Sequence, residues 1–129
     1  MINKNEIRWG NTILQKKNGR ILPVACEAEQ LALIAQGQLG DLFPVVLKAE
    51  LLLKNGFVEN KDYALLPQAH EYRRVVAVKS KGHHELLAYV KSNGECLAWA
   101  TTDGIQSSNH VFQLHQLQNL HFALTGTEL

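Results

Sequence analysis

Histidine is the residue type in this sequence with the most chemistry to offer, and the chain has six of them. His110, His115 and His121 follow one another at spacings of five and six, whereas two metal ligands on one helical face need a spacing of three or four. The pair His83 and His84 precedes Glu85, but neighbouring residues of a strand point to opposite sides. We therefore predict no metal site and interpret residues 83–85 as a solvated turn.

Residues suited to nucleophilic catalysis are scattered. Ser80, Cys96 and the histidines are the candidates, yet none lies in a Gly-x-Ser-x-Gly or His-Glu-x-x-His signature, and no glycine-rich loop is suited to hold a phosphate. Nucleophilic catalysis requires a nucleophile, a base and an orienting group together. The sequence favours a protein without enzymatic activity and without a cofactor, and a hydrolase or metal enzyme is the least favoured alternative.

One local group of basic residues is a candidate polyanion-binding site: Arg73, Arg74, Lys79 and Lys81, on or beside a single expected strand at 72–79. Binding of nucleic acid there would weaken with salt, because counterions are released from the phosphates. The competing interpretation, which we favour, is that charged residues at strand ends deter edge-to-edge aggregation.

The composition is that of one globular domain spanning residues 1–129. Hydrophobic residues make up 46% and charged residues 19% of the chain, and the net charge is +1, so no overall field attracts nucleic acid or an anionic membrane. Cys26 and Cys96 form no metal-binding pattern, which predicts buried thiols in a reducing compartment. The first residues lack the apolar run of a signal peptide, and we expect a cytoplasmic protein in a bacterial host.

Two Asn-Gly pairs predict two β-hairpins, because both turn positions accept positive φ. The first joins strands at 7–15 and 20–25, and its Trp9 is expected in the core. The second joins 85–91 and 95–101, and if Asn93 and Gly94 are its two turn residues, Val90 faces Leu97 and Ala88 faces Trp99. Both faces of this hairpin are apolar, which predicts a cover on each side or a curved sheet.

Helical patterns occur three times. Residues 27–36 and 48–55 predict two short helices, each followed by a glycine, and the leucine spacing from Leu114 to Leu124 predicts a C-terminal helix capped near 107–109 and ended by Gly126. Further strands are expected at 43–47 and 63–66. The predicted fold is a single α+β domain, with an antiparallel sheet of about five to six strands packed by two short helices and the C-terminal helix.

The two ends of the chain carry motifs of a family. The C-terminal residues 115–126, His-Gln-Leu-Gln-Asn-Leu-His-Phe-Ala-Leu-Thr-Gly, the stretch 43–57 ending Leu-Leu-Leu-Lys-Asn-Gly-Phe, and Arg8-Trp9-Gly10-Asn11 together resemble a family of small uncharacterised proteins from Bacteroidetes phages and mobile elements. That family has Tyr where this chain has His121, and Thr where it has Lys48. The loss of Thr removes a helix-capping oxygen. The resemblance implies a phage, prophage or mobile-element setting and no particular activity.

We therefore expect a non-enzymatic accessory protein that acts by binding a macromolecule, either a protein partner or a second copy of itself. We expect no association with a membrane. The alternative is a nucleic-acid-binding accessory factor that uses the strand bearing Arg73 and Arg74, with the N-terminal hairpin as a further contact. The sequence does not identify the partner, and it assigns no specific function to the protein.

Overall fold

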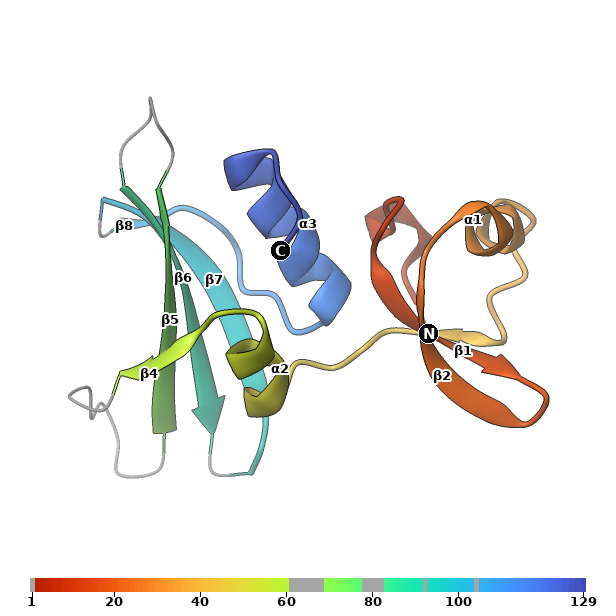
Figure 1. The fold of residues 1–129 in the computed structure, drawn as a ribbon, viewed down its shortest axis with the longest axis horizontal. Helices are drawn as coiled ribbons and strands as arrows, with labels where there is room; N and C mark the ends of the chain where they lie inside the picture. The colour runs from red at the N-terminus through yellow and green to blue at the C-terminus, as the bar shows by residue number, and fades with distance from the viewer. Residues whose placement is uncertain (1, 61–68, 78–82, 92, 104) are drawn as a thin grey trace.

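The computed structural model describes residues 2–60, 69–77, 83–91, 93–103 and 105–129. They form two lobes joined by the extended residues 44–48, with the C-terminal helix between them (Figure 1). We refer to residues 2–43 as the N-terminal lobe and to the described residues from 45 onward as the C-terminal lobe. The predicted strand at 63–66 lies outside the described residues.

The N-terminal lobe is a small antiparallel sheet covered on one face by a helix. A 3₁₀ turn, η1 (Lys4–Glu6), precedes β1 (Thr12–Lys17) and β2 (Arg20–Ala25), and the helix α1 (Ala28–Ala35) leads to β3 (Leu42–Phe43). The sheet order is β2-β1-β3. Asn18 and Gly19 both have positive φ, of 52° and 75°, so the first predicted Asn-Gly hairpin is confirmed.

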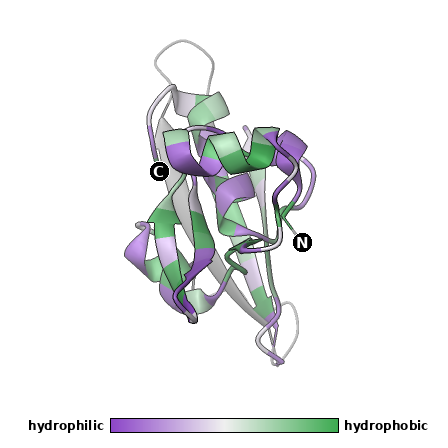
Figure 2. Cartoon of the chain, turned by 90° about the vertical axis from the view of Figure 1, so that its right-hand side faces the viewer, coloured by the Kyte–Doolittle hydropathy of each residue, from purple (hydrophilic) through white to green (hydrophobic). Residues whose placement is uncertain are grey.

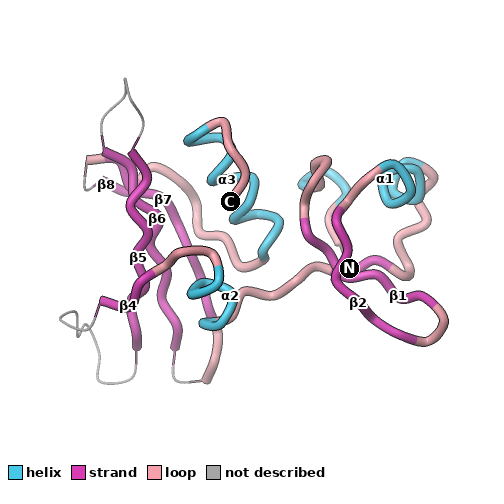
Figure 3. The backbone as a smooth tube through the Cα atoms, viewed as in Figure 1, coloured by secondary structure: helices cyan, strands magenta, loops and turns pink. Residues whose placement is uncertain are grey.

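The C-terminal lobe is a larger antiparallel sheet with two helices on one face. The helix α2 (Ala49–Lys54) precedes β4 (Val58–Asn60), β5 (Ala69–Ala77), β6 (His83–Lys91), β7 (Cys96–Thr102) and β8 (Ile105–Gln106), and α3 (Leu114–Thr125) ends the chain. The strands pair in sequence order. A tube drawing shows that one extended segment carries the chain from the small sheet to the large one (Figure 3).

The predicted fold class, α+β with antiparallel strands, two short helices and a C-terminal helix, is confirmed, but the prediction of one sheet of five to six strands is wrong. The strands form separate sheets of three and five strands. The first hairpin completes its sheet with the nearby β3, which pairs through Leu14 with Phe43 and Gln15 with Leu42. Pro44 follows at once and cannot donate to a ladder, so the chain leaves the small sheet there.

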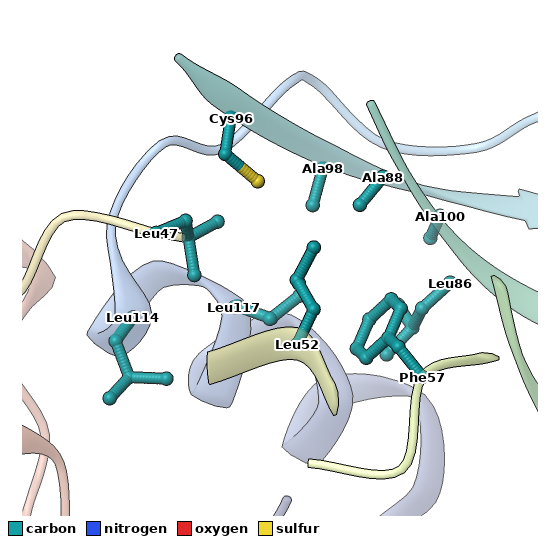
Figure 4. Close-up of a cluster of buried hydrophobic side chains, with 10 residues drawn as sticks. All are labelled: Leu47, Leu52, Phe57, Leu86, Ala88, Cys96, Ala98, Ala100, Leu114 and Leu117. Atoms are coloured by element: carbon teal, nitrogen blue, oxygen red, sulfur yellow. The ribbon is translucent and has the colours of Figure 1, made fainter. Parts of the chain in front are cut away.

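Each lobe has its own hydrophobic cluster. The smaller one contains Ile13, Cys26, Ile34 and Leu42. The larger one joins α2 and α3 to β6 and β7, as the close-up shows; its buried residues are Leu47, Leu52, Phe57, Leu86, Ala88, Cys96, Ala98, Ala100, Leu114 and Leu117 (Figure 4). Both cysteines are free and buried, as predicted. The helices therefore position two small cores rather than one.

The predicted register of the second hairpin is wrong by one residue. Val90 lies opposite Cys96, and Ala88 lies opposite Ala98. The backbone N–H of Lys91 donates to the carbonyl of Glu95 at 2.8 Å, and Gly94 has a φ of 87°, so three residues separate the paired positions instead of two. One extra loop residue moves every side chain of β7 to the other face.

The corrected register places three alanines toward the helices and two large aromatic residues on the opposite face. Leu86, Ala88, Ala98 and Ala100 face the helices, and the small alanines let α2 and α3 approach the sheet. The opposite face carries Tyr89 and Trp99, whose rings meet edge to face with centroids 4.7 Å apart, and His110 lies against Trp99. The helices cover one face of this hairpin, and residues 105–111 run along the edge of β7.

The start of α3 also differs from the prediction. Its N-cap is Gln113, which forms a capping box with Gln116, and the expected caps at 107–109 lie in an extended segment beside β7. Gly126 ends the helix in the left-handed region with a φ of 72°, as predicted. Among the described residues, no helix combines the length and apolar character that crossing a membrane requires.

Candidate docking surface

The predicted basic site is placed only in part. Arg73 and Arg74 lie in β5, where Arg73 is opposite Val58 of β4 on one side and Leu87 of β6 on the other. The backbone at Arg73 is therefore inside the sheet rather than at its edge. Lys79 and Lys81 lie outside the described residues, as does the candidate nucleophile Ser80.

The remaining candidates for chemistry do not converge. No three His, Cys, Asp or Glu side chains come together as a metal site within the described parts of the chain. Burial raises the pKa of Cys96 to about 11, which leaves the thiol protonated and poorly nucleophilic. His84 Nδ1 is 2.8 Å from Thr102 Oγ1, which donates to Ser107 Oγ at 3.1 Å, so threonine separates the imidazole from the serine.

The polar segment that follows β8 lines a depression at the surface. Its volume is about 510 Å³, and its lining residues are Gln106, Ser107, Ser108 and Asn109. The backbone N–H of Ala100 donates to Ser108 Oγ at 2.8 Å, and Gln106 Nε2 donates to the carbonyl of Ser108 at 2.9 Å. These side chains hold the segment 105–109 to itself and to β7, which is a structural role.

The first hairpin presents the most distinctive surface. All residues of β2 except Val24 are exposed, including Ile21 and Leu22, which are 53% and 54% exposed. Lys16 and Lys17 of β1 and Arg20 at the start of β2 are exposed at the same end of the hairpin. We refer to Lys16, Lys17, Arg20, Ile21, Leu22 and Pro23 as the hairpin surface.

Only one face of the small sheet is covered by α1. Ile13 and Gln15 point toward the helix, where Gln30 Nε2 donates to Gln15 Oε1 at 2.9 Å, and Lys17 pairs with Glu29 at 2.6 Å. Residues opposed in an antiparallel pair share a face. Lys16 with Ile21, and Leu14 with Pro23, therefore lie on the other face. This second face is apolar with a positive rim (Lys16), and its residues on β2 are exposed.

The outer edge of β2 is poorly suited to continue the sheet. Proline has no N–H to donate and is tolerated in a strand where that position points away from the neighbouring strand. Pro23 lies at the centre of β2, so the outward edge lacks a donor there. A second strand added to this edge would leave an acceptor unpaired in its middle. Any contact made at this edge would therefore depend on side chains rather than on a hydrogen-bonded ladder.

A polar stripe of α3 fixes the position of the hairpin. Thr12 at the start of β1 makes two bonds with Gln118: its N–H donates to Oε1 at 2.8 Å, and its hydroxyl accepts from Nε2 at 3.0 Å. Asn119 Oδ1 accepts from Asn11 Nδ2 at 2.8 Å and from Arg8 Nε at 3.1 Å. Asn119 Nδ2 donates to the carbonyl of Glu6 at 2.6 Å. Every polar atom of both amides is used.

Arg8 extends this contact to the end of the chain. Its guanidinium makes two bonds to Glu128, at 2.7 Å and 3.0 Å, and lies 4.3 Å from the centroid of the Phe122 ring. The hydrogen bond from Arg8 is the main reason that the pKa of Glu128 is lowered, and the pKa of Arg8 is raised in turn. The contact is both electrostatic and aromatic.

The predicted core position of Trp9 is wrong, because the side chain is 57% exposed. Residues 8–11 form a turn in which the N–H of Asn11 donates to the carbonyl of Arg8 at 3.1 Å and the N–H of Arg8 donates to Asn11 Oδ1 at 2.7 Å. Trp9 lies at the tip of this turn. The turn directs Asn11 and Arg8 toward α3 and leaves the indole at the surface.

Sequence reasoning missed the polar stripe as an interface, although a signal was present. His115, Gln118, Asn119 and Phe122 have the spacing of one helical face, and this face is centred roughly opposite the stripe of leucines. The hydropathy view from the N-terminal side shows hydrophobic and hydrophilic segments interspersed rather than separated (Figure 2).

Comparisons of the chain with protein-family models, with curated proteins and with solved structures find no match.

Proposed function

We propose that this chain is a non-enzymatic accessory protein of a phage or mobile element that binds another protein through the hairpin surface. The observation that carries the proposal is the exposure of both faces of β2, with Ile21 and Leu22 each more than half exposed on opposite faces. A strand of a stable sheet usually buries at least one face, so a strand with two exposed aliphatic faces has the character of a contact surface.

The chemistry of the hairpin surface favours a protein partner over nucleic acid. Isoleucine and leucine have no ring on which a base can stack, and nonspecific single-strand binding depends on such stacking and on a basic groove. Lys16 and Arg20 border the aliphatic residues and Lys17 is paired with Glu29, so the free positive charge forms a rim. A partner segment with aliphatic side chains and acidic residues complements this arrangement.

The setting of the proposal comes from the motif resemblance, and the fold adds a role for two of those motifs. The Arg8-Trp9-Gly10-Asn11 turn and the Gln118-Asn119 pair bind one another directly. They act together to hold the N-terminal lobe against α3. In this proposal the family motifs build the frame, and the hairpin surface, which lies outside them, makes the contact.

The test is capture of partners by the tagged full-length chain from host lysate, with and without nuclease. The matched variants are Ile21→Ser with Leu22→Ser at the hairpin surface, and Ile105→Ser at the far edge of the large sheet, where the side chain is 74% exposed. All three are surface changes that should alter stability by only about 0.5 kcal/mol each. We expect a discrete protein that survives nuclease, is lost with the hairpin variant and is retained with Ile105→Ser.

Two other results would count against binding of a protein at the hairpin surface. Equal capture by the hairpin variant and the wild type contradicts the hairpin surface as the contact. Recovery of nucleic acid, or of proteins that disappear on nuclease treatment, supports the alternative at Arg73 and Arg74. That alternative predicts binding that weakens with salt and in the Arg73→Ala, Arg74→Ala variant.

A further inference from the structure

His115 is a buried side chain whose two ring nitrogens have no hydrogen-bond partner. Its exposed fraction is 0%, and neither Nδ1 nor Nε2 is bonded. Buried polar groups in folded proteins are nearly always bonded, because an unbonded one costs about 1–3 kcal/mol. An imidazole in this state needs an explanation beyond packing.

The position of His115 is as informative as its burial. It is the second residue of α3 and belongs to the stripe that meets the N-terminal lobe, three and four residues before Gln118 and Asn119. Its Nε2 lies 3.7 Å from Glu6 Oε2, which also accepts a hydrogen bond from Gln116 Nε2 at 2.6 Å. The imidazole is thus held between the lobes, next to a carboxylate that already has another partner.

We propose that His115 is a pH-sensitive latch between the lobes: the neutral imidazole permits docking of the N-terminal lobe on α3, and its protonation in mildly acidic solution releases that lobe. The latch rests on the contact between the lobes and stands independently of what the hairpin surface binds. The only chemical change is the uptake of one proton from solvent, which forms one N–H bond on the imidazole.

The direction of the pH effect depends on which influence on the pKa of His115 is largest. Burial lowers the pKa of His115 and outweighs the neighbouring Glu6 carboxylate, which raises it. The N-terminal end of a helix also disfavours a cation. Glu6 of η1 is the charged group that faces the imidazole, and Arg8, which follows η1, is bonded to Asn119 one turn further along.

The pKa of His115 is lowered in the docked state, and it returns to the ordinary value of 6.5 when the lobes separate. Docking is therefore fully stabilised above pH 6.5 and weakens as the pH falls toward the lowered pKa. One proton changes the docking equilibrium by at most about tenfold per pH unit in this window. Above pH 7.5 the imidazole is neutral in both states, and the lobes should show no dependence on pH from this source.

The test is amide hydrogen exchange of the full-length chain at pH 7.5 and pH 5.5, expressed as protection factors. The reporter is the amide of Thr12, which donates to Gln118 across the contact, and the reference is the amide of Ala98 within the C-terminal lobe. We expect protection at Thr12 to fall by up to about tenfold relative to Ala98 at pH 5.5. His115→Leu should retain it, and His110→Gln, an exposed control, should lose it like the wild type.

Three results would overturn the latch. The first is an equal loss at pH 5.5 in the wild type and in His115→Leu, since the effect would then come from other groups. The second is a direct NMR titration of the wild type in which His115 has a pKa at or above 6.5, which needs no variant to fold. A lowered pKa together with no loss at Thr12 also contradicts release of the lobe.

Discussion

The two faces of α3 hold the molecule together by different means. One face carries Leu114, Leu117 and Leu124 against the large sheet, where Leu117 is fully buried beside Leu52 and Leu86. The other carries Gln118 and Asn119 against the small sheet, where the amides are bonded on all their polar atoms. Apolar packing accepts many partners of similar size, whereas paired amides accept one geometry.

This difference predicts where the stability of the molecule resides. The apolar face should contribute most of the free energy of unfolding of the C-terminal lobe. The polar face should contribute less free energy and should set the orientation of the N-terminal lobe, because its hydrogen bonds replace bonds to water. Substitutions on the two faces of one helix therefore separate the two roles.

Leu117→Ala should have the largest effect. Removing a fully buried leucine costs about 2–5 kcal/mol through lost transfer free energy and a residual cavity. Urea unfolding followed by circular dichroism measures this loss. Ala123→Ser on the exposed side of the same helix is the matched control and should change the free energy of unfolding by less than about 0.5 kcal/mol. A loss below about 1 kcal/mol for Leu117→Ala would contradict the assigned core.

The two thiols report the two lobes separately. Cys26 lies in the small cluster and Cys96 in the large one, and burial raises the pKa of both, that of Cys96 from 9.0 to about 11. At pH 8 a shift of this size lowers the thiolate fraction of Cys96 about a hundredfold. Labelling with a maleimide, read by mass spectrometry on single-cysteine variants, should be slow at both sites in native protein and fast in urea.

Fast labelling of Cys96 in the native protein would contradict its placement in the large cluster. Fast labelling of Cys26 alone would show that the small cluster opens independently of the large one. That second result would locate the less stable part of the molecule in the N-terminal lobe.

Asn119→Ala should have a smaller and more local effect than Leu117→Ala. It removes the acceptor shared by Asn11 and Arg8 and the donor to the carbonyl of Glu6, at a cost of about 1–3 kcal/mol. Hydrogen exchange should show a larger loss of protection in β1 than in β7. Asn109→Ala, an exposed amide elsewhere, is the control. Equal loss of protection in both lobes would contradict a contact that acts mainly on orientation.

The sequence was informative where a single element determines the structure. The Asn18-Gly19 turn, the glycine at the end of α3 and the leucine stripe all depend on neighbouring residues, and all were predicted. The β6–β7 register was wrong because a glycine with positive φ fits both a two-residue and a three-residue loop, and only the closed ladder from Lys91 to Glu95 decides.

The candidate surface was less accessible to prediction. The polar stripe of α3 has a helical spacing that is visible in the sequence, but glutamine and asparagine are as suited to solvent as to an interface. Exposure of Ile21 and Leu22 depends on which strands lie beside β2, and that follows from the small sheet closing with Leu42 and Phe43. The alternation of the strand alone predicts no exposed apolar face.

Glu128→Gln should have the smallest effect and tests the electrostatic part of the polar face. The hydrogen bond from Arg8 lowers the pKa of Glu128 below 4.5, so its contribution to docking is present above that value and is lost as the pH falls through the lowered pKa. The carboxylate is exposed, and salt should weaken the pair. Thermal unfolding at pH 7 should therefore show a small decrease in Tm that shrinks in 1 M salt and near pH 3. A decrease of the same size at pH 7, near pH 3 and in 1 M salt would contradict a role for the charge of Glu128, because the two side chains have nearly the same shape and differ mainly in that charge.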